Sequence, residues 1–415
     1  MKLKTLYLHI FSAVLIILSL SGCSRTANDH EILFVGIDAL DWEIMNPLMD
    51  AGRLPNFNRL KRMGVSARIN TNETGGSAVY WTSIATGQHA DKHGIKGFVY
   101  NDPETDEITP YTSNTRKSKA FWNILNDKGI SSGVIGWYIS WPAEALNGFM
   151  ISSYMGLKEK DQMTWKGTLY AGVSGMVYPQ DLQSRVDEYI RTAEASYLTK
   201  LGNIVRPKEL LTESPEILTT KGSFLTDEIY HAAALDLLKK NRPRVFAVYY
   251  SCLDVVGHQF THPIPAVQKS LEEKYGKVQE NYYLYLDRVL GHFLAELKRN
   301  TILVVVSDHG LRGNEHTDDG VFMATGPPIK QNTWTHEQIN LTDIAPTMLY
   351  LLGLPVSLEM DGRVFTGAVK DEYLMGNSIQ YVPSFGPRDN IDESPTKSQF
   401  DDQIIQRLKT LGYLK

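Results

Sequence analysis

Aspartate and histidine residues follow three long apolar runs of the sequence, at the point where each run ends. One more histidine lies in a polar loop after the third run. The six residues are Asp38, Asp254, His258, Asp308, His309 and His316. Asp254 and His258 are four residues apart, so one turn of helix would point both side chains the same way. Carboxylate and imidazole groups in this number can bind divalent transition-metal ions, and the absence of thiolate ligands argues against a structural zinc cluster.

Ser77 carries the hydroxyl that such ions could activate. It ends a polar turn over 72–76 and precedes a predicted helix over 78–86 that Gly87 closes. A hydroxyl at a helix N-terminus lies beside unpaired N–H groups and the positive end of the helix dipole, which can hold an anion. Two interpretations are open: Ser77 caps the helix, or it is a nucleophile. The Asp and His residues favour the nucleophile, because two ions about 3.5–4 Å apart can hold both the attacking and the leaving oxygen of a phosphoryl transfer.

The alternation of apolar runs with helical patterns predicts the fold class. The apolar runs span 31–37, 132–137, 244–250 and 302–306, and the helical patterns span 117–126, 225–240 and 280–299. Continuous apolar runs are typical of strands that are buried on both faces. We therefore predict an α/β fold with a doubly wound, mostly parallel sheet flanked by helices. In such sheets ligands bind at the carboxyl ends of the strands, where the Asp and His residues stand.

Residues 1–22 are predicted to be a lipoprotein signal peptide. Two lysines precede an apolar stretch over 6–20 that is too short and wrongly flanked for a membrane span. The ending Leu-Ser-Gly-Cys23 resembles the lipobox of bacterial lipoproteins, which implies that Cys23 is lipidated and that residues 23–30 form a tether. Because Ser24 and not aspartate follows, we predict an outer-membrane anchor that faces the periplasm or the exterior. The alternative is a cleaved signal with an incidental cysteine.

The composition is that of a large globular enzyme. Of the 415 residues 42% are hydrophobic, and the net charge of -5 is mild, with no basic block suited to nucleic acid. The predicted partner is a small substrate, and the predicted contact with the membrane is the lipid on Cys23. If Cys23 is lipidated, Cys252 has no cysteine partner, so we predict an exported protein without a disulfide. The sequence gives no indication of the oligomeric state.

Several motifs surround the ligand-type residues in a specific order along the chain. They are Trp81-Thr-Ser-Ile-Ala-Thr-Gly87 after Ser77, His93-Gly-Ile, Asp254-x-x-Gly-His258, Ser-Asp308-His309-Gly, the loop from His316 to Ala-Thr-Gly326-Pro-Pro, Leu341-Thr-Asp-Ile-Ala-Pro-Thr and Met360-Asp-Gly362. Together they resemble the alkaline phosphatase superfamily, and within it the type I phosphodiesterase/nucleotide pyrophosphatase group. The resemblance covers most of the chain after the tether.

The resemblance implies a division of the ligands between two ions. One zinc would be surrounded by Asp38, Ser77, Asp308 and His309, and the other by Asp254, His258 and His316. Manganese is an alternative metal. Ser77 would attack phosphorus and form a phosphoseryl intermediate, which water then hydrolyses. His336 is the alternative to His316 as the third ligand of the second ion. We prefer His316, because His316 precedes a Val-Phe-Met-Ala-Thr-Gly segment as in the family.

The chain departs from that group at positions that bind substrate. The nucleophile is often threonine there and is Ser77 here. Ala78 replaces an aromatic that commonly stacks on a nucleobase, and Phe98 stands where an asparagine helps to bind a phosphoryl oxygen. Tyr249 matches a base-stacking tyrosine, and a core aromatic at a strand end is an equal interpretation. These departures weaken the case for a nucleotide substrate and leave the two-metal chemistry in place.

We therefore predict a catalytic domain over 31–370, with an insertion at about 157–217 that roofs the pocket, and a tail over 371–415 that packs on the domain. The predicted function is that of a phosphoric ester hydrolase, foremost a phosphodiesterase. The alternatives are a phosphomonoesterase, or a phosphotransferase acting on lipids or cell-surface glycans. The rival from another class is a surface binding protein with a decayed site. A sulfatase is disfavoured, because Ala-Val-Tyr-Trp and not x-Pro-x-Arg follows Ser77.

Overall fold

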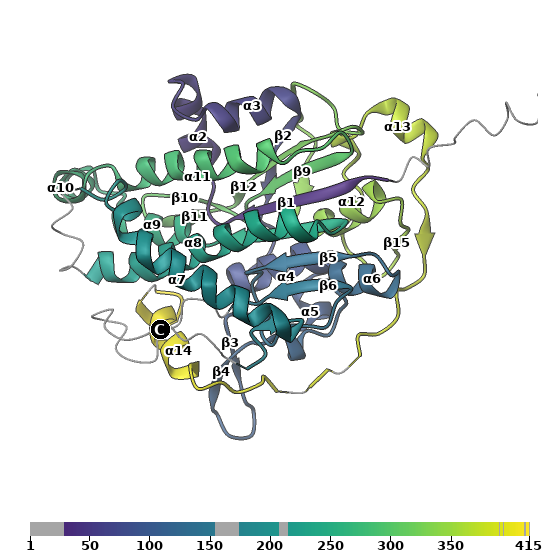
Figure 1. The fold of residues 1–415 in the computed structure, drawn as a ribbon, viewed down its shortest axis with the longest axis horizontal. Coiled ribbons are helices and arrows are strands. Elements are labelled where there is room, and N and C mark those ends of the chain that lie inside the picture. The colour runs from purple at the N-terminus through teal and green to yellow at the C-terminus, as the bar shows by residue number, and fades with distance from the viewer. Residues whose placement is uncertain are drawn as a thin grey trace, which may run out of the picture.

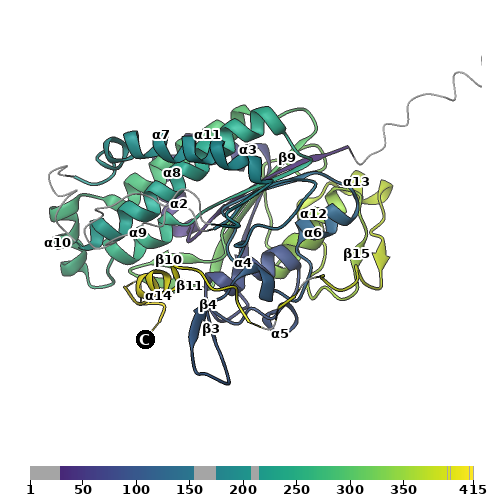
Figure 2. The ribbon, with the colours of Figure 1, turned by 60° about the horizontal axis from the view of Figure 1, so that its bottom comes forward.

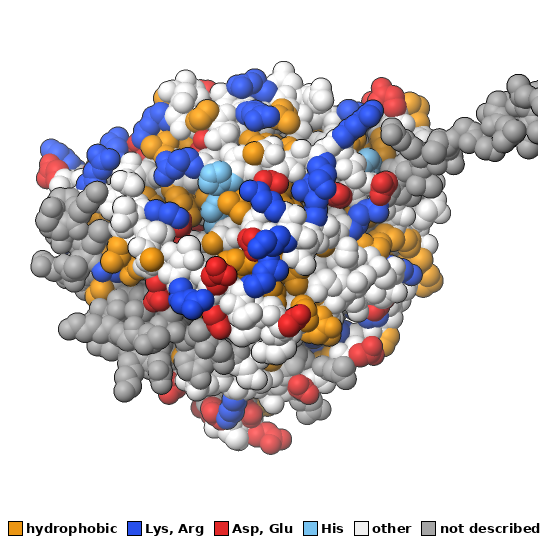
Figure 3. Space-filling view, viewed as in Figure 1, with side chains coloured by type: hydrophobic (Ala, Val, Ile, Leu, Met, Phe, Trp, Pro, Cys, Tyr) orange, Lys and Arg blue, Asp and Glu red, His pale blue; other side chains and the backbone are white. Residues whose placement is uncertain are grey.

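The computed structural model describes residues 29–153, 174–206, 215–389, 391–392, 394–410 and 412–414. The predicted signal peptide, most of the tether and two parts of the predicted insertion lie outside these ranges. Among the helices of the described ranges, none has the length and apolar character needed to cross a bilayer. The face shown in Figure 3 carries Lys and Arg side chains intermixed with Asp and Glu.

A ten-stranded sheet forms the centre of the described fold, in the order β13-β2-β12-β9-β1-β8-β5-β6-β7, with β14 also paired to β2 (Figure 1). Its strands are β1 (Glu31–Ile37), β2 (Val65–Asn70), β5 (Ser132–Ile135), β6 (Gly148–Ile151), β7 (Val177–Tyr178), β8 (Val245–Tyr250), β9 (Thr301–Val306), β12 (Asp319–Thr325), β13 (Thr333–Trp334) and β14 (Ile339–Asn340). The five central strands from β9 to β6 run parallel, while β12 is antiparallel to both β9 and β2. The prediction of a mostly parallel α/β sheet is confirmed.

The central strand β1 shows why the apolar runs of the sequence are continuous. Leu33, Val35 and Ile37 face one core, and Ile32 and Phe34 face the other. Both faces are covered by helices, so both sets of side chains leave water. Figure 2 shows α7, α8 and α11 on one side of the sheet and α4, α6 and α12 on the other.

The described helices match the predicted patterns where the sequence showed them. They are α2 (Trp42–Asp50), α3 (Pro55–Met63), α4 (Ser77–Thr86), α5 (Ala90–His93), α6 (Phe121–Asp127), α7 (Gln183–Leu201), α8 (Pro215–Asn241), α9 (Cys252–Phe260), α10 (Pro265–Tyr275), α11 (Val278–Ala295), α12 (Ile344–Leu351), α13 (Asp371–Gly376) and α14 (Asp401–Thr410). The remaining strands form small pairs: β3 (Val99–Asn101) with β4 (Ile108–Pro110), β10 (Gly310–Arg312) with β11 (Glu315–Thr317), and β15 (Val356–Ser357) with β16 (Tyr381–Val382).

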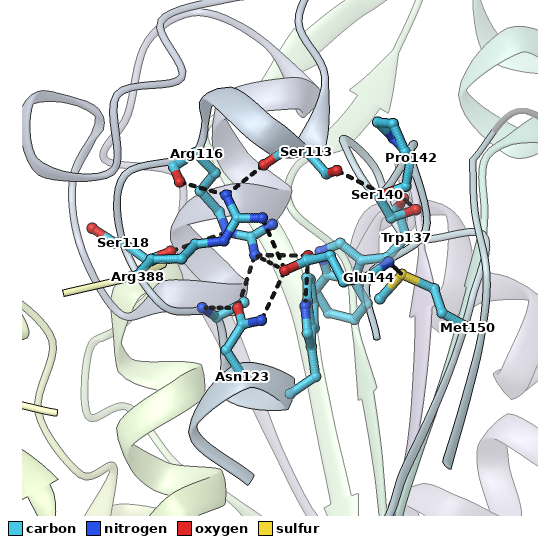
Figure 4. A network of polar contacts seen from close by, with 12 residues as sticks. Ser113, Arg116, Ser118, Asn123, Trp137, Ser140, Pro142, Glu144, Met150 and Arg388 are labelled. Carbon is cyan, nitrogen blue, oxygen red and sulfur yellow. Dashed lines mark hydrogen bonds and ion pairs between the residues drawn. The ribbon is translucent and has the colours of Figure 1, made fainter. Parts of the chain in front are cut away.

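The tail after α13 runs along the domain and returns to the carboxyl ends of the central strands (Figure 1). Figure 4 shows one of its attachments, a buried network around Glu144. The Glu144 carboxylate accepts from Arg116 at 2.8 Å and from the tail residue Arg388 at 3.0 Å. Arg388 also donates to the carbonyl oxygens of Ser113 and Arg116. The side chain of Arg116 is 2% exposed, so its charge depends on Glu144 for compensation.

We expect Glu144→Gln to lower the free energy of unfolding by about 3–5 kcal/mol, because two guanidinium groups would keep their charge without a counter-ion. Burial raises the pKa of Glu144, but Arg116 and Arg388 outweigh it and lower the pKa from 4.5 to about 2. A folded-state pKa below the unfolded value means that this contribution is present above pH 4.5 and is lost as the pH falls toward 2. The wild-type and variant stabilities, measured by denaturant unfolding, should therefore converge as the pH is lowered through this window.

The matched control is Glu107→Gln, which breaks the exposed pair between Glu107 and the tail residue Lys397. Because both partners are in water, this change should barely alter the unfolding midpoint. Equal losses in the two variants would contradict the importance of the buried network.

Candidate active site

The carboxyl ends of three neighbouring strands hold most of the predicted ligands. Asp38 follows β1, Asp308 and His309 follow β9, and α9 begins just after β8 and carries Asp254 and His258. The turn after β9 is fixed by Ser307, whose hydroxyl accepts from the N–H of Leu40 and donates to the carbonyl of His309. The order of the strands in the sheet, β9-β1-β8, therefore places these side chains next to one another.

The first group consists of Asp38, Asp308 and His309, whose ligand atoms all lie within 4.8 Å of one another. His309 Nε2 lies 3.1 Å from Asp38 Oδ1 and 3.5 Å from Asp308 Oδ2. All three residues are almost completely buried, at 2%, 0% and 1% exposure. We call this group the first triad.

The electrostatics of the first triad favour a cation. Burial and the neighbouring charge of Asp38 raise the pKa of Asp308 well above its ordinary value. Burial lowers the pKa of His309, but the carboxylates of Asp308 and Asp38 outweigh it and raise the pKa to about 10. Two carboxylates in a dry site are stabilised by positive charge, either a proton on His309 or a metal ion in the proton's place.

The second triad consists of Asp254, His258 and His316, again with ligand atoms within 4.8 Å of one another. The one-turn spacing on α9 brings His258 Nε2 to 3.4 Å from Asp254 Oδ1. The β10–β11 hairpin supplies His316, whose Nε2 lies 3.1 Å from the same oxygen and 2.8 Å from His258 Nε2. Burial raises the pKa of Asp254, but hydrogen bonds with His258 and His316 outweigh it and hold the pKa well below its ordinary value.

The two triads are neighbours. The rings of His309 and His316 stack at 3.9 Å between centroids, with an interplanar angle of 27°. One imidazole from each triad thus forms the boundary between them.

Ser77 is the first residue of α4 and lines a cavity that one residue of each triad also lines. Its helix is capped by Gly76, which has a φ of 82°, and no cap hydrogen bond from a side chain is made. The interpretation of Ser77 as an N-cap is therefore wrong: glycine adopts the left-handed conformation that the turn requires, and the serine follows it. A cavity of about 150 Å³ is lined by Ser77 together with Asp38 of the first triad and Asp254 of the second.

The other residues singled out in the sequence have clear positions. His336 is exposed and belongs to neither triad, whereas His316 does. Ala78 is fully buried against Ile95 and Ile139. Tyr249 is 3% exposed, packs its ring at 4.6 Å from that of Trp81 and donates its hydroxyl to Asp38 Oδ2.

Two residues of the site were missed by sequence reasoning. Asn314, in the β10–β11 turn, makes a 2.8 Å contact from its Oδ1 to His258 Nδ1, which orients the ring and leaves Nε2 for the centre. Tyr413 of the tail donates its hydroxyl to Asp254 Oδ2. A polar residue between two short strands is an ordinary turn signal, and a tyrosine near the end of an amphipathic tail gives no local sign of where it packs.

The donor set fits divalent metal ions. Asp38 Oδ1, both carboxylate oxygens of Asp308 and Nε2 of His309 are buried and make no hydrogen bond among the described residues, although Nε2 lies within ion-pair distance of both carboxylates. Buried polar atoms without partners are costly, so a ligand that all of them face would remove that cost. Carboxylate and imidazole groups are ligands of zinc and manganese.

Comparisons with known proteins match most of the chain. A family model described as type I phosphodiesterase / nucleotide pyrophosphatase matches residues 32–372. The solved structure of the alkaline phosphatase PafA matches with a TM-score of 0.56 at 13% identity, covering 82% of this chain and 99% of that chain. The similarity to PafA shows that the two share the fold.

Two curated relatives match shorter stretches. The 2,3-bisphosphoglycerate-independent phosphoglycerate mutase 2 of Methanosarcina barkeri (strain Fusaro / DSM 804) is 24% identical over 206 residues, which are 44% of this chain and 35% of that protein. The arylsulfatase K of Rattus norvegicus is 28% identical over 128 residues, which are 24% of this chain and 23% of that protein. The matches span only about a third and a quarter of these relatives. The family model, in contrast, extends over most of the chain and includes both triads and Ser77. The chain therefore belongs to the type I phosphodiesterase / nucleotide pyrophosphatase family.

Proposed function

We propose that the chain is a two-metal hydrolase of phosphoric esters, foremost a phosphodiesterase, with Ser77 as its nucleophile. The observation that carries the proposal is that Ser77 and one aspartate from each of the two ligand triads, Asp38 and Asp254, line one cavity. The first triad, with the Ser77 oxygen, would hold one ion, and the second triad would hold the other. Zinc suits this set of carboxylates and imidazoles, and manganese is the alternative.

The bound ions would lower the pKa of the Ser77 hydroxyl and stabilise charge on the leaving oxygen. In the first half of the reaction, Ser77 Oγ loses its proton and bonds to phosphorus, while the bond from phosphorus to the leaving oxygen breaks and that oxygen takes a proton. In the second half, water bonds to phosphorus and the bond from phosphorus to Ser77 Oγ breaks, which restores the hydroxyl. The N-terminal end of α4 favours the negative charge of a phosphoryl group at this position.

The lining of the cavity indicates the kind of leaving group. Away from the triads, most of the wall is aromatic or aliphatic, as in Phe98, Tyr111 and Val255, and among the described lining residues Arg407 carries the positive charge. The aromatic position next to the nucleophile is taken by the buried Ala78, and Tyr249 is held by Asp38. An ester with an apolar or aryl leaving group therefore fits this wall better than a nucleotide does.

The proposal is tested with protein purified with its metals and assayed on an aryl phosphate diester, the matching monoester and the matching sulfate ester. We expect the diester to have the highest kcat/KM. A monoester preference would favour the phosphatase alternative. Two bound metals without turnover would point to a phosphotransferase that needs an acceptor alcohol. Absence of both turnover and metal would contradict the proposal and leave the surface binding protein.

A further inference from the structure

The tail forms one wall of the catalytic cavity. Ile404, Arg407 and Leu408 of α14 line the cavity, and so does Tyr413 beyond the helix. The Tyr413 ring stacks on Phe98, with 4.8 Å between centroids and an interplanar angle of 11°. It also lies edge-on to His258 at 5.5 Å. The tail therefore reaches the proposed metal ligands themselves.

The two oxygens of Asp254 have different partners. Oδ1 faces the imidazoles of His258 and His316, at 3.4 Å and 3.1 Å from their Nε2 atoms. Oδ2 accepts from the Tyr413 hydroxyl. A carboxylate held in this way has one oxygen fixed by a hydrogen bond and the other directed at the nitrogen ligands.

The first triad repeats this arrangement with residues from other parts of the chain. Asp38 Oδ1 lies 3.1 Å from His309 Nε2, and Asp38 Oδ2 accepts from the Tyr249 hydroxyl at 2.5 Å. Tyr249 comes from β8 and Tyr413 from the tail. A buried phenol such as that of Tyr249 needs an acceptor in any protein, but that need alone does not explain why the half-buried Tyr413 has the same pairing at the second triad. In each case the phenol binds the oxygen that points away from the imidazoles.

The position of Tyr413 is fixed by contacts at several points of the tail. Arg407 donates to Ser223 of α8 at 2.5 Å, and the N–H of Thr396 donates to Thr112 at 2.9 Å. Arg388 joins the buried network of Glu144 (Figure 4). These attachments lie along the segment before Tyr413. They therefore hold the tail in a position that brings Tyr413 to Asp254.

We propose that Tyr413 is a positioning residue: by binding Asp254 Oδ2 it holds Oδ1 toward the second metal position, which makes the carboxyl-terminal tail a part of the active site. The inference rests on the proposed two-metal function. Hydrogen bonds to the far side of a metal ligand fix its orientation, and removing such a bond typically costs about 10–100-fold in metal affinity or activity.

The test is Tyr413→Phe, which keeps the ring on Phe98 and removes only the hydroxyl. We expect zinc affinity at the second triad to fall about 10–100-fold in competition with a chromogenic chelator, while affinity at the first triad stays near that of the wild type. The zinc-dependent rise in the unfolding temperature should shrink accordingly, while the unfolding temperature in chelator stays near that of the wild type. The kcat of Tyr413→Phe should be closer to that of the wild type when zinc is in excess than when zinc is limiting. The matched control is Tyr381→Phe, an exposed tyrosine of the same tail, which should change none of these quantities.

Wild-type zinc affinity in Tyr413→Phe, with two ions bound and normal hydrolysis in the wild type, would overturn the positioning role and leave the proposed function standing. A wild-type chain that binds no metal would overturn both. Equal loss of zinc affinity in Tyr381→Phe would also overturn the inference, because it would assign the effect to the packing of the tail in general.

Discussion

Replacement of Ser77 by alanine is expected to lower kcat for the preferred phosphoric ester by on the order of a thousandfold or more, because the attacking oxygen is lost. The side chain is small, and its hydroxyl does not cap α4, so the unfolding temperature should stay close to that of the wild type. Steady-state kinetics of the metal-loaded proteins measure the first effect. Mass spectrometry after an acid quench should find a phosphoryl group on the Ser77 peptide of the wild type and not of the variant.

Ser83→Ala is the matched control, because Ser83 lies in the same helix and is also buried. Its hydroxyl bonds to Glu73 and His93 at 3.1 Å, and it does not line the catalytic cavity. We expect this change to cost stability and to leave kcat within a few-fold of wild type. If Ser77→Ala keeps wild-type turnover, the nucleophile is another group.

Replacement of Asp308 by asparagine is expected to have opposite effects with and without metal. With chelator present, the variant should be at least as stable as the wild type, because Asp308 and Asp38 are two fully buried carboxylates in one triad. With zinc present, the free energy of unfolding of the wild type should increase more than that of the variant does. At a free zinc concentration 100 times the dissociation constant, binding adds about 2.7 kcal/mol, and the variant should lose most of this gain at the first site. Thermal unfolding of both proteins, in chelator and in zinc, measures the two opposite changes in stability.

The turnover of Asp308→Asn should fall together with its zinc-dependent stability, since both depend on the same ion. The control is Asp318→Asn, an exposed aspartate beside β12 that belongs to neither triad, for which we expect no change in either quantity. If Asp308→Asn gains as much stability from zinc as the wild type does, Asp308 is not a ligand.

Much of the catalytic framework could be predicted because its signals are local. The runs that became β1, β8 and β9 are continuously apolar, since strands covered by helices on both faces need apolar side chains throughout. The polar residue that ends each run then stands at the carboxyl edge of the sheet. The four-residue spacing of Asp254 and His258 required only that they share a helix, and α9 provides it.

Other features depend on tertiary packing and carry no local signal. The antiparallel insertion of β12 between β9 and β2 follows from the β10–β11 hairpin, which reverses the chain after Asp308 and His309 and presents His316. Tyr413 and Asp254 are 159 positions apart, so neither periodicity nor spacing could link them. Tyr249 was singled out as an aromatic, but its bond to Asp38 depends on the pairing of β8 with β1.

The central claim is that the two triads each hold one metal ion in a single active site. The most direct measurement is the number of zinc ions per chain, by elemental analysis after equilibration with zinc, for the wild type, Asp308→Asn and His258→Ala. We predict two ions in the wild type and one in each variant, with the loss of turnover tracking the loss of the ion. Two ions in all three proteins, or none in the wild type, would contradict the claim.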